Sequence, residues 1–178
     1  MIKTLWEEMK REFRRSESQY KVALALLNHG LSIRVVRRGV ERRVRIYLGS
    51  IEIPYKSLAE ACGVDWRTVK SALDKISKNP FLREFFENIE NAGPFFRGVV
   101  DKLGYRCIVV ETKVDKPGII AYVTRLLADK NVNILQVIAE HPLISTPPKL
   151  HIIIEGEVPG EVIPQILKHE AISKISVY

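Results

Sequence analysis

Residues 112–134 read TKVDKPGIIAYVTRLLADKNVNI, and their pattern is the clearest indication of how the C-terminal part of the chain folds. Asp115-Lys-Pro-Gly118 is a typical helix start, because proline is favourable in the first helical turn. The apolar residues that follow recur at helical spacing and predict one buried face, made of Ile119, Ile120, Val123, Leu126 and Leu127. A helix therefore separates one β-rich run before it from another after it.

The same alternation continues on both sides of this helix. Strands are predicted at Tyr105–Thr112, Asn133–Glu140, Lys149–Glu155 and Ile172–Tyr178, and a short helix at Pro159–Lys168. A proline-rich loop, His141–Pro148, joins the second and third strands. This βαββαβ order predicts a ferredoxin-like sheet with both helices on one face.

Residues 112–134 resemble the opening of an ACT domain. That family reads D-(R/K)-P-G before two hydrophobic residues and a helix, and G/N-(V/I)-N-I at the second strand. The resemblance covers residues 105–178, and it implies side-by-side pairing of two chains with a small ligand, often an amino acid, at the seam. The ligand-binding residues that it implies are Asp115, Lys116, Pro117, Gly118, Ile119, Asn133 and Ile134. A tight loop without a ligand is the alternative, because some ACT domains are purely structural.

Residues 55–76 read YKSLAEACGVDWRTVKSALDKI and contain a second clear structural pattern. Gly63 predicts a turn between two helices, and Asp65 predicts the N-cap of the second one. The predicted buried stripe of that helix consists of Val69, Ala72, Leu73 and Ile76. Its opposite face carries Arg67, Lys70, Ser71 and Lys75, with Thr68 at the N-terminal end, which is typical of a helix-turn-helix that enters the DNA major groove. A helical hairpin that contacts proteins is the alternative. For Trp66 we expect packing against the neighbouring helix rather than contact with bases.

The segment just upstream predicts an arginine-rich β-hairpin. Leu31–Arg38 and Arg42–Leu48 are β-rich and flank Gly39-Val-Glu41. Six arginines face a single glutamate within 12 residues, namely Arg34, Arg37, Arg38, Arg42, Arg43 and Arg45. Because such dense like charges repel one another unless an anion lies nearby, they favour an arm that lies on phosphates. The alternative is a solvated edge hairpin whose charges prevent edge-to-edge pairing.

Charge divides the chain in the same way. Residues 1–100 carry 19 Lys and Arg against 12 Asp and Glu, whereas residues 101–178 carry 9 of each. The basic excess therefore lies in the first part, which indicates a polyanionic partner for that part. We predict a helix-turn-helix domain at 1–92, a linker at 93–104 and an ACT domain at 105–178. The predicted fold class is α+β: a mainly helical, winged helix-turn-helix domain with a β-hairpin, then a ferredoxin-like βαββαβ domain.

Composition and motifs argue against several other classes. With 46% hydrophobic and 28% charged residues the chain is globular, and no apolar run approaches the roughly 20 residues that cross a bilayer. We expect a cytoplasmic protein without a membrane partner, in which Cys62 and Cys107 are free thiols. No catalytic, metal-binding or cofactor-binding motif is found, and His141 and His151 are not expected to be metal ligands. We therefore expect no catalytic residues, no metal and no cofactor.

The whole chain also resembles an uncharacterised archaeal group described as predicted regulators of amino acid metabolism. Gly49-Ser-Ile-Glu-Ile-Pro54, Gly63-Val-Asp-Trp-Arg67 and Ala92-Gly-Pro-Phe95 carry this resemblance. It implies a transcriptional regulator that binds double-stranded DNA as a homodimer, or a higher even oligomer, and senses an amino acid. The alternative is a regulatory subunit or adaptor that docks on a biosynthetic enzyme and does not bind DNA.

Overall fold

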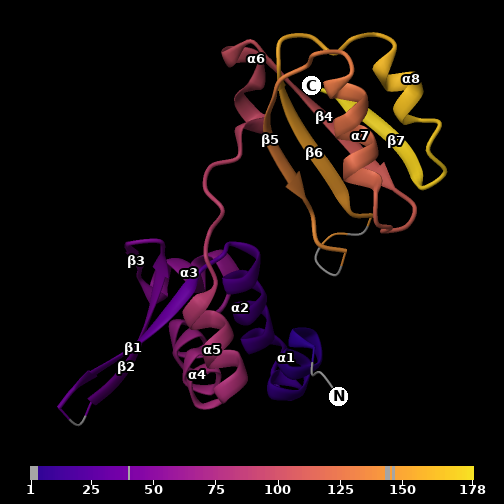
Figure 1. The fold of residues 1–178 in the computed structure, drawn as a ribbon. Coiled ribbons are helices and arrows are strands. Elements are labelled where there is room, and N and C mark those ends of the chain that lie inside the picture. Colours follow the sequence, from indigo (N-terminus) through magenta and orange to yellow (C-terminus); the bar gives the residue numbers. More distant parts are fainter. Residues whose placement is uncertain (1–3, 40, 143–144, 146) are drawn as a thin grey trace. The chain divides into compact units, whose positions relative to one another are not determined.

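The chain divides after Gly93 into two units, residues 1–93 and 94–178, in the computed structural model (Figure 1). The structure describes residues 4–39, 41–142, 145 and 147–178. The first unit combines helices with a three-stranded sheet, and the second combines a four-stranded antiparallel sheet with helices. The predicted α+β fold class is confirmed.

The first unit contains five helices and three strands among its described residues: α1 (Leu5–Phe13), α2 (Glu17–Asn28), β1 (Ser32–Arg38), β2 (Glu41–Leu48), β3 (Ile51–Ile53), α3 (Tyr55–Cys62), α4 (Trp66–Lys78) and α5 (Pro80–Asn88). Residues 5–28 form two helices rather than one. The break is set by Ser16, which leaves the helical conformation and whose hydroxyl accepts a hydrogen bond from the Gln19 amide at 3.3 Å.

Helices α3 and α4 form the predicted helix-turn-helix. Gly63 ends α3 with a φ of 64°, a left-handed conformation that favours glycine. Asp65 then caps α4, because its carboxylate accepts a hydrogen bond from the Arg67 amide at 2.8 Å. All four residues of the predicted stripe on α4 are fully buried, so the helical phase predicted for this segment is confirmed.

The hairpin of β1 and β2 extends beyond the helical core and gains a third strand that the sequence did not predict. Ile33 pairs with Ile46 at its buried end, and Arg37 pairs with Arg42 near the turn. Strand β3 is only three residues long and pairs with β2 at Ile46–Leu48. A run this short carries little alternation, which explains why the sequence does not predict it.

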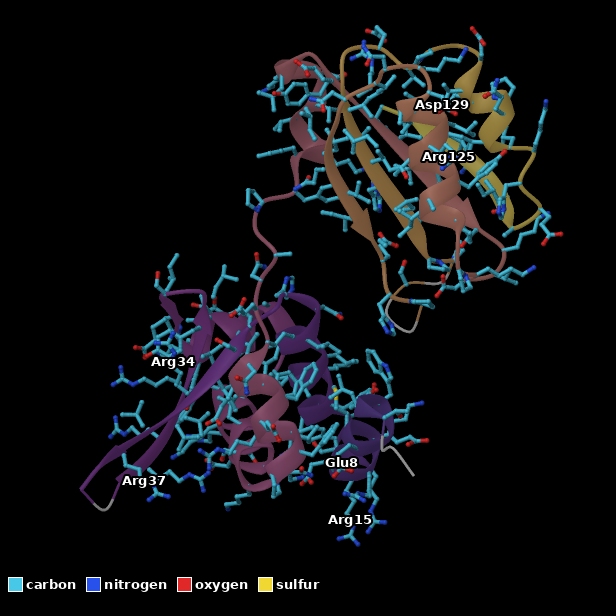
Figure 2. All side chains as sticks on the ribbon, viewed as in Figure 1. Glu8, Arg15, Arg34, Arg37, Arg125 and Asp129 are labelled. Atoms are coloured by element: carbon cyan, nitrogen blue, oxygen red, sulfur yellow. The ribbon has the colours of Figure 1, made fainter. Side chains whose placement is uncertain are left out.

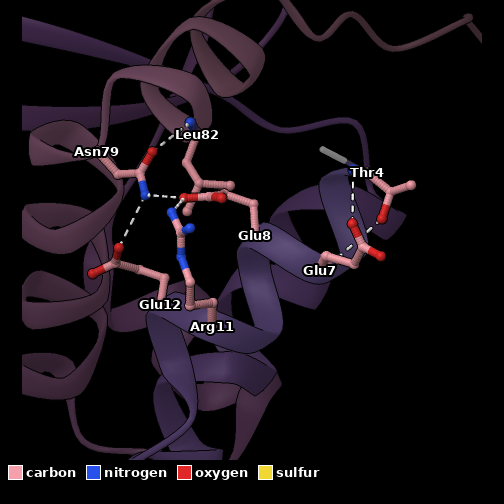
Figure 3. Close-up of polar contacts among 7 residues, drawn as sticks. All are labelled: Thr4, Glu7, Glu8, Arg11, Glu12, Asn79 and Leu82. Carbon is pink, nitrogen blue, oxygen red and sulfur yellow. Dashed lines mark hydrogen bonds and ion pairs between the residues drawn. The ribbon is translucent and has the colours of Figure 1, made fainter. Parts of the chain in front are cut away.

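A buried carboxylate fixes α1 to the junction between α4 and α5 (Figure 3). Glu8 is 3% exposed and contacts both Arg11 and the Asn79 side-chain amide, the latter at 2.8 Å. Asn79 also donates to Glu12 at 3.0 Å, and its own oxygen accepts from the Leu82 amide at 3.2 Å. Asn79 therefore caps α5 and anchors α1 with one side chain.

The second unit has the predicted βαββαβ order. Its elements are η1 (Phe96–Val99), α6 (Val100–Leu103), β4 (Tyr105–Thr112), α7 (Ile119–Ala128), β5 (Ile134–Ala139), β6 (Lys149–Glu155), α8 (Val162–Ile166) and β7 (Ile172–Val177). The sheet order β5-β6-β4-β7 is that of a ferredoxin-like fold, with α7 and α8 covering one face (Figure 1). On α7, Ile119, Val123 and Leu127 are buried, whereas Ile120, predicted on the buried face, is exposed.

The opposite face of this sheet is covered in part by the segment expected as a linker. Residues 96–103 form the helical turns η1 and α6, and Val100 is buried against Cys107, Val109 and Ile153. The Gln136 side chain donates to the Pro94 carbonyl at 2.8 Å and accepts from the Phe96 amide at 3.3 Å. The segment is thereby fixed to β5 from its first residue.

Candidate functional site

An open cavity of about 350 Å³ lies between the hairpin and α4, and we call it the basic cavity. The residues that line it are Arg42, Arg43, Val44, Tyr55, Trp66, Lys70 and Asp74. Three of the residues predicted to bind DNA, Arg42, Arg43 and Lys70, thus come together although they belong to two elements. Phosphate oxygens are the ligands that such a group of cations prefers.

Strand periodicity explains why Arg42 faces α4. Alternate residues of β2 point to opposite faces, and Val44 and Ile46 are buried against the helices. Arg42 shares their face, and its guanidinium donates to the Ser77 carbonyl near the end of α4 at 2.7 Å. This hydrogen bond holds the hairpin arginine beside the helix.

The start of α4 carries Trp66. The residue is 41% exposed and lines the basic cavity. The Arg67 guanidinium lies 5.3 Å from the centre of its ring, and Arg67 itself is exposed beside the capping residue Asp65. An aromatic side chain and a cation therefore project together from the first turn of this helix.

Of the remaining residues predicted to bind DNA, those whose side chains the structure describes do not line the basic cavity. Arg37 is exposed near the turn of the hairpin (Figure 2), and the side chain of Arg38 lies outside what the structure describes. Thr68 is half-buried. Ser71 faces α2 instead of the cavity, because its hydroxyl accepts a hydrogen bond from the Gln19 side chain at 2.8 Å.

Sequence reasoning missed two polar residues of the basic cavity, Tyr55 and Asp74. The Tyr55 hydroxyl donates to the Val44 carbonyl, and its pKa is raised by burial and by the nearby negative charge of Asp74. Arg43 and Arg45 act in the opposite direction. Asp74 could have been found from spacing alone, because it follows Trp66 and Lys70 at intervals of four residues, which places the three on one side of α4.

A second cavity, of about 400 Å³, opens at the start of α7, and we call it the loop cavity. Its lining includes the predicted Asp115, Lys116, Pro117, Gly118 and Ile119, together with Thr112, Ile120, Ala139, Glu140, Pro148, Lys149 and Leu150. Gly118 has a φ of 95°, and no side chain caps α7. The first amides of that helix are therefore available to an anionic group.

The charges around the loop cavity are unequally compensated. Lys116 pairs with Glu170 at 2.9 Å and, by that hydrogen bond and its charge, holds the pKa of Glu170 below its ordinary value. Lys149 lies 3.9 Å from Glu111. Among the residues described, the Asp115 carboxylate has no hydrogen bond or ion pair. A ligand amine would therefore find a free carboxylate at Asp115.

Two predicted ligand residues lie apart from the loop cavity within one chain. Ala139 and Glu140, which line the cavity, stand at the end of β5, whereas Asn133 and Ile134 stand at its beginning. The Asn133 side chain donates to Glu155 at 3.1 Å, and Ile134 pairs with Ile154. One chain alone does not bring the two sets of residues together.

The described part of the chain has neither a cluster of metal ligands nor a helix suited to a membrane. Among those residues, no group of three or more His, Cys, Asp or Glu is placed to hold a metal ion. Within residues 4–39, 41–142, 145 and 147–178, no helix has the length and apolar character needed to cross a membrane.

Comparisons with known proteins give only distant similarities. No protein-family model matches the sequence, and no curated protein matches it. The crystal structure of PH0061 shares 18% identity over 70% of this chain and 78% of that chain, with a TM-score of 0.26. The transcriptional regulatory protein PF0864 of Pyrococcus furiosus, a member of the AsnC family, shares 12% identity over 71% of this chain and 77% of that chain, with a TM-score of 0.27. TM-scores this low assign no function to the present chain.

Proposed function

We propose that this protein is a DNA-binding transcriptional regulator that responds to a small amino-acid-like effector. The observation that carries the proposal is the basic cavity, in which Arg42 and Arg43 of the hairpin meet Lys70 of α4. In a helix-turn-helix the second helix enters the major groove, and flanking cations contact phosphates. The exposed pair Trp66 and Arg67 occupies the part of that helix which reaches base edges.

The test is the salt dependence of binding to duplex DNA by the full chain. If about six phosphates are neutralised, affinity falls on the order of a thousandfold between 50 and 200 mM salt. Replacing Arg42 and Arg43 together by alanine should weaken binding to all sequences. It should also reduce the slope of log affinity against log salt concentration by about two. A matched control removes two exposed cations of the second unit, Arg125 and Lys168.

Equal loss in the double variant and its control would place the DNA-binding surface elsewhere. Absence of any salt-dependent binding by the wild type would refute the DNA-binding proposal. That result would favour the alternative function, an adaptor that docks on a biosynthetic enzyme.

The loop cavity is the proposed effector site. An amino acid would place its carboxylate on the free amides of α7 and its ammonium group on Asp115. A ligand at a hundred times its dissociation constant adds about 2.7 kcal/mol of stability, which raises the unfolding temperature of a protein of this size by roughly 5–20 °C. A thermal-unfolding screen with the twenty amino acids measures this shift, and Asp115→Ala should abolish it while Glu161→Gln keeps it. If no compound raises the transition, the cavity is not an amino-acid site.

The proposed assembly is a homodimer that pairs through β5. This strand is an edge of the sheet, and its sequence ILQVIA carries no charge, although exposed edges are commonly protected by charged residues. Leu135 and Val137 are each 41% exposed on it. Antiparallel pairing of two copies would bring Asn133 of the partner subunit close to Ala139 and Glu140 of the loop cavity. Asn133 and Ile134 would then complete the site across the seam.

A further inference from the structure

Three residues form a stripe along the side of α4 that lines the basic cavity, and one of them, the half-buried Asp74, is acidic. Trp66, Lys70 and Asp74 follow each other at intervals of four residues, and all three line the basic cavity. Asp74 is the single carboxylate among the described residues of that lining. On a surface that binds only phosphates, a negative charge weakens binding.

The Asp74 carboxylate is not compensated within the fold that the structure describes. It forms no hydrogen bond or ion pair with a described residue, although three cations line the same cavity. Arg42 instead donates to the Ser77 carbonyl at 2.7 Å. The cap of α4 is Asp65, and the Ser77 hydroxyl bonds to the backbone oxygen of residue 74, not to the side chain. Together with burial, the negative charge of Asp74 raises the pKa of Tyr55, which lines the same cavity.

An acidic side chain on a DNA-facing surface lowers the affinity for most DNA sequences but not for all of them. It repels phosphates on every sequence, and the repulsion is offset only where a base presents a hydrogen-bond donor. In the major groove cytosine presents its N4 amino group, whereas guanine presents two acceptors and thymine an acceptor and a methyl group. Adenine presents an amino group next to the N7 acceptor, which a carboxylate avoids.

We propose that Asp74 is a specificity-determining residue that selects cytosine at one position of the bound DNA site. The inference rests on the proposed function, since it requires α4 to face the major groove. Lys70 and Arg67 would then supply affinity, while Asp74 lowers affinity for every sequence that lacks the cytosine amino group.

The experiment selects bound duplexes from a random library with the full-length protein and with three variants. Asp74→Asn keeps the shape and removes the charge, and Asp74→Ala removes both. Glu60→Gln is the matched control, because it removes one exposed carboxylate of α3 that does not line the basic cavity. Affinities for random duplex and for the selected site are measured at one fixed salt concentration, and thermal unfolding verifies that each variant folds.

The wild type should prefer cytosine over the other bases at one position by roughly 5- to 150-fold. Both Asp74 variants should lose this preference and bind random duplex about fivefold tighter, the effect of one unit-charge repulsion across 4 Å of water. The asparagine variant should gain adenine at the same position, because asparagine bonds to N6 and N7 of adenine. Glu60→Gln should keep the cytosine preference.

Two results overturn the inference by different routes. In the first, the wild type binds DNA with the expected salt dependence and the Asp74 variants keep the preference for cytosine. Asp74 then does not contact the base, and the DNA-binding proposal stands. If the wild type shows no salt-dependent binding, the proposed function fails and the assignment of Asp74 falls with it.

Discussion

His151 and Glu140 form a polar pair within the second unit, where apolar residues dominate. His151 is 2% exposed, and its Nε2 lies 2.9 Å from a Glu140 carboxylate oxygen. The centres of the Phe95 and His151 rings are 5.1 Å apart. Burial acts to raise the pKa of Glu140, yet hydrogen bonds with Ser145 and His151 hold it below the ordinary value of 4.5. The ionised carboxylate is thus the form that the fold stabilises.

This pair predicts a defined loss of stability in acid. Because the pKa of Glu140 is lower in the folded than in the unfolded chain, its contribution is present above about pH 4.5, the ordinary Glu value, and is lost as pH falls through the folded value. Glu140→Gln should therefore destabilise the protein most above that pH, with a difference from wild type that shrinks towards pH 3. Urea unfolding at several pH values measures it. Glu161→Gln, an exposed partner of Lys130, is the control, and a Glu140→Gln difference that does not vary with pH would contradict the prediction.

At the scale of elements, the start of α7 depends on the backbone of Gly118. Its φ of 95° is strained for residues with a Cβ, yet no atom lies within 4 Å of where that Cβ would stand. Gly118→Ala should therefore cost about 1–2 kcal/mol through conformation alone. Gly160→Ala is the matched control, because that site is equally open and has no positive φ. Denaturant unfolding compares the two, and equal stability of both variants would show that the α7 start does not require this conformation.

Elements with strong periodicity could be predicted from the sequence, and contacts between elements could not. The strands Tyr105–Thr112 and Lys149–Glu155 have the predicted bounds, since continuous apolar runs bounded by loops mark buried strands. Burial of Glu8 depends on Asn79, 71 residues away, so no local pattern predicts it. Tyr55 joins the basic cavity, and Glu140 the loop cavity, by contacts between elements that no local pattern predicts either.

At the scale of the whole molecule, the charge distribution and the uncharged edge of the second sheet complement each other. The basic excess lies within residues 1–100, whereas the second part of the chain is neutral. Neutral surfaces can pair without the repulsion that would oppose contact between two basic ones. If the protein dimerises through the second unit, both helix-turn-helix units can bind DNA. Two linked DNA contacts give a higher affinity than one.

The dimer proposal predicts different effects for lysine at the two edges of the sheet. Val137 on β5 and Val177 on β7 are 41% and 44% exposed, so neither replacement leaves a cavity in the core. Val137→Lys places like charges on the paired strands and should give a monomer by light scattering, whereas Val177→Lys should remain a dimer. The monomer should also lose affinity for a two-fold symmetric DNA site while keeping that for a half-site. If only Val177→Lys dissociates the dimer, the interface lies at β7 instead of β5. A monomeric wild type would refute the proposed dimer, and Asn133 would then not come close to the loop cavity.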